Sequence, residues 1–360
     1  MAGLELGSGK KLKMSAYLNT RVSLYSGRLL RDQDIDALVR LPQAEMAETL
    51  SAYGLPQLAA GFEPAAAHEQ DLRSLEQRII AQILDETQVL IRPLAGDERS
   101  FLMYWTSRFE ISNVKTLLRG KMTGERPAAL LARLTPMGPF GRIDNQELAH
   151  AEDVGELLQR LENGAYAGIV RLARRAFEDS RDPFNLDAAL DRGYYEGLIQ
   201  RARPLEKAEG APLRNLMAGL IDRINLVWLL RYRFNYGLPP AQVYYLLLGS
   251  RYSLSGTLLR ELASLDSLEA VLDALPPTWQ TRLAGAADVP SVFIRMEQLT
   301  AELAARTLQS SAPGMTRAFA YLLLRERDLR AVRAVLRGRH LGLSEVAIRF
   351  ALQRTPERVM

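Results

Sequence analysis

The sequence contains no cysteine in 360 residues and only three histidines. Without a thiol, the chain can form no disulfide, no iron–sulfur cluster and no thiolate zinc site, and it has no cysteine nucleophile. The histidines, His68, His150 and His340, are never three or four residues apart, so no two of them can share a helix face to bind a metal. We therefore expect neither a metal site nor a cofactor.

Long apolar runs are absent as well. Stretches such as Ala318–Leu324 are far shorter than the roughly 18–20 residues that a membrane-spanning helix needs. Residues 1–14 carry Lys10, Lys11 and Lys13 but lack the apolar core of a secretory signal. We read residues 1–14 as a flexible leader and expect no direct membrane insertion.

An excess of one charge is also missing. The chain has 46 basic and 42 acidic residues, a net charge of +4, with an isoelectric point of about 9.3. Because the bases alternate with acids, as on solvated helix faces, no strong positive patch for nucleic acid is predicted. We expect no nucleic-acid partner.

Motifs of the common catalytic sites are not found. A P-loop needs glycine, four residues and then Gly-Lys-Ser/Thr, and the stretch Gly7–Lys11 does not match it. The sequence has no G-x-S-x-G elbow and no dinucleotide-binding glycine motif behind a strand. The sequence therefore predicts no catalytic residue.

Helical periodicity runs along almost the whole chain. The segment Asp36–Leu50 predicts two short helices divided by Pro42, and Leu72–Ile91 predicts one long amphipathic helix. Clusters of glycine and proline, such as Pro136–Gly141 and Pro204–Pro212, predict breaks between helices. Because strict alternation is scarce and hairpin signals are missing, the predicted fold class is all-α.

One helical segment occurs three times. We call Phe101–Gly124 the first copy, Leu213–Gly237 the second and Phe319–Gly342 the third, and they align without gaps until their last few residues. Their spacing of more than 100 residues exceeds the roughly 20–50 residues of solenoid repeats. The pattern therefore predicts three sequence-related helical units. Their approximate bounds are residues 15–130, 131–240 and 241–360.

Each copy carries the same polar pattern. An acid is followed three residues later by asparagine, or by Ala331 in the third copy, and an arginine, a second base and a glycine end the helix. The candidate residues are Glu110, Asn113, Arg119, Asp222, Asn225, Arg231, Asp328 and Arg337. We expect the acids and asparagines to be partly buried and hydrogen-bonded beside the apolar stripe. The bases suit the helix C-terminus, where the macrodipole favours cations.

A single active site explains a threefold pattern poorly. The acid and the arginine of one copy are nine residues apart, about 13 Å along a helix, so they cannot act directly on each other. We interpret the pattern as structural pairing between neighbouring helices, with contacts at a partner's rim as the alternative for the arginines. The stretch Leu30–Leu50 resembles the segments that follow the first two copies, which indicates a permuted or offset unit at the start of the chain.

Aromatic residues gather near the repeated helices. They include Tyr104, Trp105, Tyr232, Phe234, Tyr236, Tyr244 and Tyr245. We interpret them as core residues. The alternative is a contact surface for a partner, because aromatic side chains are enriched at interfaces.

Four segments, taken in order, resemble the C subunit of the V/A-type rotary ATPases, which is called the d subunit in the vacuolar form. They are the opening Tyr17–Val22 with Leu29 and Leu30, then Glu110–Lys121, Asn225–Leu238 and Tyr321–Leu343. The resemblance extends from Tyr17 to Phe350. It departs from the family pattern at Ala331 and in residues 1–14.

The resemblance implies three related helical domains with pseudo-threefold symmetry, arranged as a funnel or cup. It implies a non-catalytic central-stalk part that rests on the membrane proteolipid ring, receives the shaft made by the D and F subunits, and transmits torque for proton or sodium transport. The location implied is cytoplasmic and peripheral to the membrane. A helical scaffold unrelated to the ATPase and an enzyme with an unrecognised all-α site are the alternatives.

Overall fold

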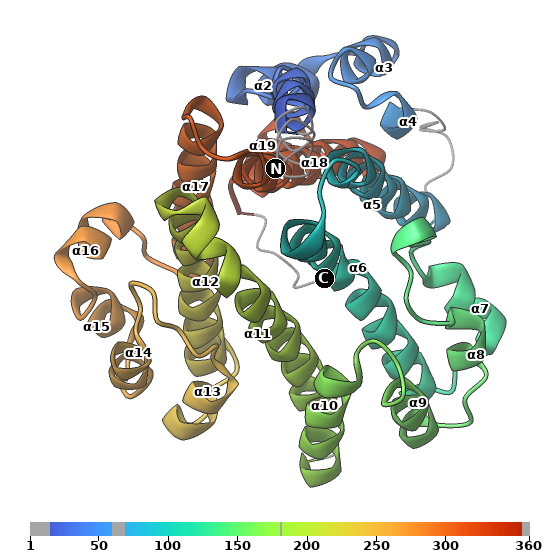
Figure 1. Ribbon diagram of the computed structural model, residues 1–360, viewed down its shortest axis with the longest axis vertical. Coiled ribbons are helices and arrows are strands. Elements are labelled where there is room, and N and C mark those ends of the chain that lie inside the picture. Colours follow the sequence, from blue (N-terminus) through green and yellow to red (C-terminus); the bar gives the residue numbers. More distant parts are fainter. Residues whose placement is uncertain (1–14, 60–68, 181, 355–360) are drawn as a thin grey trace, which may run out of the picture. The chain divides into compact units, whose positions relative to one another are not determined.

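The computed structural model describes residues 15–59, 69–180 and 182–354, and these residues form helices without any strand (Figure 1). The predicted all-α fold is therefore confirmed. The stretch read as a leader, residues 1–14, lies outside the described residues, and so does His68. Among the described helices, none combines the length and the apolar character that crossing a membrane requires.

The chain folds as two compact units. The first unit comprises the described residues within 15–102, 204–223 and 275–354, and the second comprises those within 103–203 and 224–274. The division into three repeat-based units and their arrangement as a funnel stay predictions.

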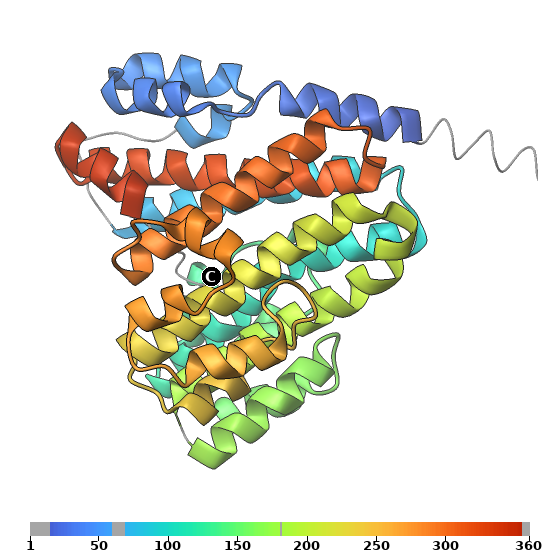
Figure 2. The ribbon, with the colours of Figure 1, turned by 90° about the vertical axis from the view of Figure 1, so that its left-hand side faces the viewer.

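The first unit is built around a long helix, α18, that contains the third copy. Its other elements are a helical stretch at residues 15–26, α2 (Asp32–Arg40), α3 (Gln43–Ala52), α4 (Pro56–Ala59), α5 (Glu69–Ile91), α16 (Pro277–Leu283), α17 (Val289–Gln309), α18 itself (Gly314–His340) and α19 (Glu345–Arg354). Helix α18 packs against α17, α5, α19 and α2. Figure 2 shows the N-terminal helices, in blue, running beside the C-terminal helices, in red.

Helix α18 is almost enclosed along its length. Phe319 is fully buried and its ring meets that of Phe101 edge-on, with the ring centroids 5.0 Å apart. Such aromatic contacts stabilise a core beyond the area they bury. The helix has no single apolar stripe, because it is covered on several sides. The two predicted short helices around Pro42 and the long helix ending at Ile91 are confirmed as α2, α3 and α5.

The second unit holds nearly all of the first copy (residues 103–124) and the end of the second (residues 224–237), with shorter helices beside them. Its elements are α7 (Pro127–Arg133), the 3₁₀-helix η1 (Gly138–Phe140), α8 (Asn145–Ala149), α9 (Val154–Leu161), α10 (Ala167–Ser180), the π-helix η2 (Arg231–Asn235), α13 (Pro240–Leu246), α14 (Gly256–Ala263) and α15 (Leu268–Asp273). Three long helices contribute residues to both units: α6 (Gly96–Met122), α11 (Pro183–Glu209) and α12 (Ala211–Leu230).

The predicted helix break at Pro204–Pro212 is wrong at its start. Pro204 lies inside α11, and the chain leaves the helix only at Gly210, which has a φ of +77°. Proline removes one backbone donor from a helix. Here the buried neighbours Ala202 and Leu205 keep the helix packed on both sides of the proline, so tertiary contacts outweigh the local signal.

A glycine near the end of α6 and of α18 allows a short helix to approach closely. A Cβ placed on Gly120 would lie 2.0 Å from Leu130 Cδ2, and one on Gly338 would lie 2.6 Å from Ile348 Cγ1. Leu130 belongs to α7 and Ile348 to α19. The second copy has Tyr232 in the place of this glycine. There the helix changes to the π-helix η2, which adds one residue to the turn.

We expect the substitution Gly120→Ala to lower the free energy of unfolding by about 1–3 kcal/mol, because the added methyl group overlaps the buried Leu130 side chain. Chemical denaturation monitored by circular dichroism measures the change. The matched control is Gly168→Ala in α10, where a Cβ meets no atom within 4 Å. The control should be neutral or slightly stabilising. Equal effects of the two substitutions would contradict the packing argument.

Candidate functional site

The first copy binds the chain that follows it through three polar side chains. Glu110, fully buried in α6, accepts hydrogen bonds from the backbone N–H groups of Arg142 and Ile143 at 2.7 and 3.1 Å. It also accepts the hydroxyl of Tyr166 at 2.6 Å. Burial and the Glu110 carboxylate raise the pKa of Tyr166 well above its usual range. The Glu110 carboxylate thus accepts from donors in the segment before α8 and from the residue that precedes α10 (Ala167–Ser180).

Asn113 makes a two-way bond with a single residue. Its Nδ2 donates to the carbonyl of Thr135, and its Oδ1 accepts the N–H of Thr135, both at 2.8 Å. Lys121 Nζ then donates to the carbonyl of Ala149 at the end of α8, at 2.6 Å. Acid, asparagine and second base therefore all bind main-chain groups. We call this set of three positions the backbone clamp.

The second copy repeats the backbone clamp on the segment around α13 and α14. Asn225 exchanges two hydrogen bonds with the backbone of Leu248, at 3.2 Å to its carbonyl and 2.8 Å from its N–H. Arg233 Nε donates to the carbonyl of Ala263 at the end of α14, at 2.9 Å. Asp222, the acid of this copy, is 1% exposed. The bonds of Asn225 and Arg233 match those of Asn113 and Lys121 position by position.

The third copy binds the beginning of the chain instead of the segment that follows it. Asp328 in α18 accepts the N–H of Leu30 at 2.9 Å, and Arg339 Nη2 donates to the carbonyl of Val39 at 2.6 Å. Helix α2 therefore stands where α8 and α14 stand in the other two copies. This agrees with the permuted unit predicted at the start of the chain.

The third copy also contains a buried ion pair that sequence reasoning missed. Arg325 is 1% exposed, and its Nη2 lies 2.9 Å from Glu86 Oε1 of α5. The same carboxylate accepts the Tyr321 hydroxyl at 2.6 Å, and Arg325 Nη2 donates to the carbonyl of Tyr53 at 3.1 Å. Such a pair needs several hydrogen bonds to offset its desolvation. No signal in a single sequence points to this pair, because the two residues are 239 positions apart.

The candidate arginines of the repeat stand outside the backbone clamp. Arg119 is exposed and its Nε donates to Asp187 of α11 at 3.1 Å. Arg231 Nη2 approaches the Tyr236 hydroxyl at 3.5 Å, and Arg337 is exposed. Arg119 therefore pairs with a side chain of a neighbouring helix, as we predicted for the pattern. The acids and asparagines bind backbone groups instead, as seen for Glu110, Asn113, Asn225 and Asp328. A contact of these arginines with a partner stays a prediction.

A second buried ion pair joins α6 and α11 in the second unit. Lys115 Nζ contacts Asp191 Oδ1, and both residues are buried. Burial raises the pKa of Asp191 to about 6, although Lys115 acts in the opposite direction. Nearby, the rings of Tyr104 and Tyr194 stack with their centroids 5.4 Å apart. Burial raises the pKa of Tyr104 to about 12.

Three residues of the predicted aromatic cluster belong to the core, and two others, Phe234 and Tyr244, are half-buried. Tyr104, Trp105 and Tyr232 are buried, as the sequence interpretation expected. Tyr236 and Tyr245 are 51% and 67% exposed. For these two, a contact surface for a partner stays a prediction. Among the described residues, no group of three histidine, aspartate or glutamate side chains is placed to hold a metal ion.

Comparison with known proteins places this arrangement in one family. A family model described as ATP synthase (C/AC39) subunit matches residues 18–350. The chain belongs to this family. The match spans all three copies and the N-terminal segment that the third copy binds. Family membership therefore covers both the repeated helices and their clamped segments.

Individual relatives of the C/AC39 family are similar at low identity. The C subunit of the A-type ATP synthase of Halorubrum lacusprofundi is 25% identical over 344 residues, covering 91% of this chain and 94% of the relative. That of Methanosphaera stadtmanae is 24% identical over 264 residues, 72% of this chain and 64% of the relative. The C subunit of the V-type ATP synthase of Deinococcus radiodurans is 25% identical over 190 residues, covering 52% of this chain and 53% of the relative. The chain thus spans less than two thirds of the methanogen relative's length.

We expect Asn113→Ala to lower the free energy of unfolding by roughly 2 kcal/mol, because the part-buried N–H and carbonyl of Thr135 lose their partner. Chemical denaturation measures the loss, and Asn225→Ala should give a similar value for the same reason. The control Asn163→Ala removes an exposed amide and should change stability by less than about 0.5 kcal/mol. A loss at Asn163 equal to that at Asn113 would refute the clamp.

The pH dependence of stability should carry the signature of Asp328. Burial raises its pKa to about 7 from the ordinary 3.8, against the opposing effects of the Leu30 N–H, Arg325 and Arg327. Between these values the folded chain keeps a proton that the unfolded chain has lost. Stability therefore falls as pH rises from about 4 to about 7, by at most about 1.4 kcal/mol per pH unit.

Asp328→Asn should remove this contribution while its amide oxygen still accepts the Leu30 N–H. Denaturation curves at pH 5, 6, 7 and 8 test this prediction. As the pH rises across this range, the free energy of unfolding of the wild type should fall relative to that of the variant. The control Asp266→Asn changes a carboxylate whose side chain is 99% exposed, and should keep the wild-type slope. Parallel curves for wild type and Asp328→Asn would show that Asp328 does not titrate there.

Proposed function

We propose that this chain is the C subunit of a V/A-type ATPase or ATP synthase and works as a non-catalytic part of its central stalk. In this role it connects the shaft made by the D and F subunits with the membrane proteolipid ring, and it passes torque between them for proton or sodium transport. The observation that carries the proposal is the family match over residues 18–350. The relatives of the family are named as C subunits of ATP synthases.

The contacts of the described residues support a part that carries mechanical load. Each backbone clamp fixes short helices to a long one through buried side chains that bind main-chain groups. Bonds of this kind resist sliding, because a shifted segment would leave buried polar groups unpaired. The buried ion pair of Arg325 with Glu86 adds a further cross-connection within the first unit. A linker that transmits torque needs such stiffness.

The proposal also fits a peripheral location. The described helices offer no candidate membrane span, so attachment to the membrane would come from partner subunits. Within this function, the arginines Arg119, Arg231 and Arg337 are candidates for contacts with those partners. Arg119 and Arg337 are exposed near the ends of their helices, where a cation is favoured.

A pull-down of the tagged chain from native membranes in mild detergent tests the function. We expect mass spectrometry to find the A and B head subunits, the D and F shaft subunits, and the proteolipid. The tag alone, expressed in the same cells, is the control. Recovery of the chain alone, or with unrelated soluble proteins, would refute the proposal and favour a scaffold outside the ATPase.

A second arm separates attachment through partners from attachment to lipid. The purified chain should not sediment with protein-free liposomes made from the same lipids. Tight binding to such liposomes would contradict a chain that reaches the membrane only through the proteolipid ring.

A further inference from the structure

Exposed apolar side chains gather around α19 in the first unit. Nine large apolar side chains are exposed in the described part of the chain, and four of them lie within residues 341–350: Leu341, Leu343, Val346 and Phe350. We call these four residues the α19 face. Val346 is the most exposed of the nine, at 76%. Apolar side chains scattered singly over a surface are normal, but a group of them marks a site of interaction.

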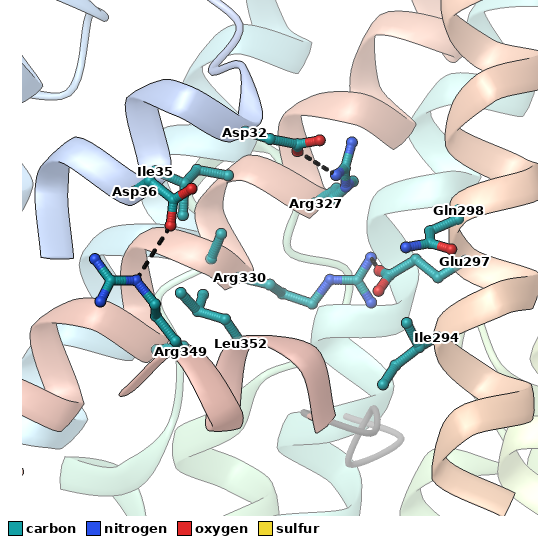
Figure 3. A pocket seen from close by; sticks show the side chains of 12 residues that line it. Asp32, Ile35, Asp36, Ile294, Glu297, Gln298, Arg327, Arg330, Arg349 and Leu352 are labelled. Carbon is teal, nitrogen blue, oxygen red and sulfur yellow. Dashed lines mark hydrogen bonds and ion pairs between the residues drawn. The ribbon is translucent and has the colours of Figure 1, made fainter. Parts of the chain in front are cut away.

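The opposite side of α19 fixes this helix to the rest of the unit. Ile348 is 1% exposed and lies close to Gly338 of α18. Leu352, one turn further along, lines a cavity beside α18, and Arg349 Nε pairs with Asp36 of α2 at 3.4 Å (Figure 3). Val346 and Phe350 each lie two residues from Ile348, about 200° around the helix. They therefore point away from the packed side.

The three copies can be compared at this place through a shared glycine. The glycines that end the long helices have φ values of +68°, +66° and +65°, and they are Gly124, Gly237 and Gly342. A buried apolar residue follows six positions later in each copy, at Leu130, Val243 and Ile348. The turn and the start of the next helix are thus built alike in all three copies.

The fold does not need an apolar surface at the positions of the α19 face. The first copy has polar or small residues there, namely Thr123, Glu125, Ala128 and Ala132. The second copy is intermediate, with Leu238 and Ala241 between the exposed Tyr236 and Tyr245. Because the same local structure forms without the large apolar side chains, the α19 face indicates a contact with another molecule.

A positive charge beside the α19 face lacks a partner of its own. Arg337 is exposed, and its carbonyl accepts the N–H of Leu341 at 3.0 Å, so the two residues are neighbours on one side of α18. Within the described residues no acidic side chain pairs with Arg337. Arg119, at the same position in the first copy, pairs with Asp187. A molecule that covers the α19 face would therefore be expected to bring an acid to Arg337.

This charge argues against a second copy of the chain as the occupant. A symmetric dimer would place the α19 face against itself and bring two Arg337 cations to one interface. Glu345, the acid of α19, already pairs with Arg349 at 3.3 Å. A lipid surface is disfavoured as well, because one exposed base attracts anionic lipid only weakly.

The shape of the α19 face favours a helix as its partner. Val346 and Phe350 are one helical turn apart, a spacing that side chains at i and i+4 of another helix match. The described residues form no strand, so they offer no sheet edge to which an extended segment could add. A proline-rich segment would need a groove lined by aromatic rings, and Phe350 is the single aromatic residue of the α19 face.

We propose that the α19 face binds one amphipathic helix of another ATP synthase subunit. The apolar side chains of this helix pack on Val346 and Phe350, and an aspartate or glutamate beside them pairs with Arg337. The inference rests on the proposed function, because that function supplies the partner subunit. It assigns Arg337 to a definite contact and leaves the equivalent surface of the first copy without this role.

Photo-cross-linking in the assembled complex tests the site. A chain with p-benzoylphenylalanine in place of Val346 is purified within the complex and irradiated. We expect it to join one helix of another subunit, and mass spectrometry should find an aspartate or glutamate within about two turns of the attachment point. The matched control carries the same photoreactive residue in place of Ala128, the equivalent exposed position of the first copy. It should not join that helix.

Two further substitutions in the photoreactive chain test the contacts. Arg337→Glu and Phe350→Ala should each reduce the yield of the adduct about tenfold. Replacing the acid that the cross-link identifies by lysine should restore the yield for Arg337→Glu, because the two charges are then exchanged. Both substitutions alter exposed side chains, so the denaturation midpoint of the purified chain should not change.

An unchanged yield with Arg337→Glu would overturn the inference. So would adducts confined to this chain, to a second copy of it or to lipid, or no adduct at all, when the complex contains all its subunits. Each of these results would leave the proposed function standing. Purification of the unaltered chain without any ATP synthase subunit would overturn both.

Discussion

Short helices packed on the side of a long helix expose backbone groups at their ends, and these groups need partners when buried. The backbone clamp provides those partners from the long helix. Asn113 satisfies both groups of Thr135, and Asn225 does the same for Leu248. Asparagine suits this position because one amide carries both a donor and an acceptor. The placement of the short helices in the first two copies depends on this bond.

The third copy has Ala331 at the position of the asparagine and contains a buried ion pair at another position of the repeat. The Glu86–Arg325 pair connects α5, α18 and the carbonyl of Tyr53. Because desolvation of the two charges is costly, such a pair depends on its surroundings more than a neutral hydrogen bond does. Burial also raises the pKa of Asp328, although the neighbouring Arg325 acts in the opposite direction. The third copy therefore combines a buried ion pair with a buried carboxylate whose pKa is raised.

Much of this structure could be predicted from periodicity and from the repeat. Helix boundaries near Pro42 and Ile91, and the shared polar positions, follow from spacing alone. The partners of Glu110 and Asn113 did not, because backbone acceptors and donors 22 to 33 residues away leave no side-chain pattern. The helix break predicted at Pro204 was wrong, because packing around α11 outweighed the tendency of proline to end a helix. Arg325 and Glu86 are 239 residues apart, and a single sequence carries no signal for such a pair.

The bond between Asp328 and Leu30 has a consequence for synthesis on the ribosome. Helix α2 leaves the ribosome early, but α18, which holds it, is made about 300 residues later. Leu38 and Val39 are both 1% exposed in the folded chain. Until α18 has been made, these apolar side chains lack the helix that covers them. Contacts so distant in sequence slow folding, and exposed apolar helices invite aggregation. The nascent chain is therefore a natural client for chaperones that shield apolar segments until translation ends.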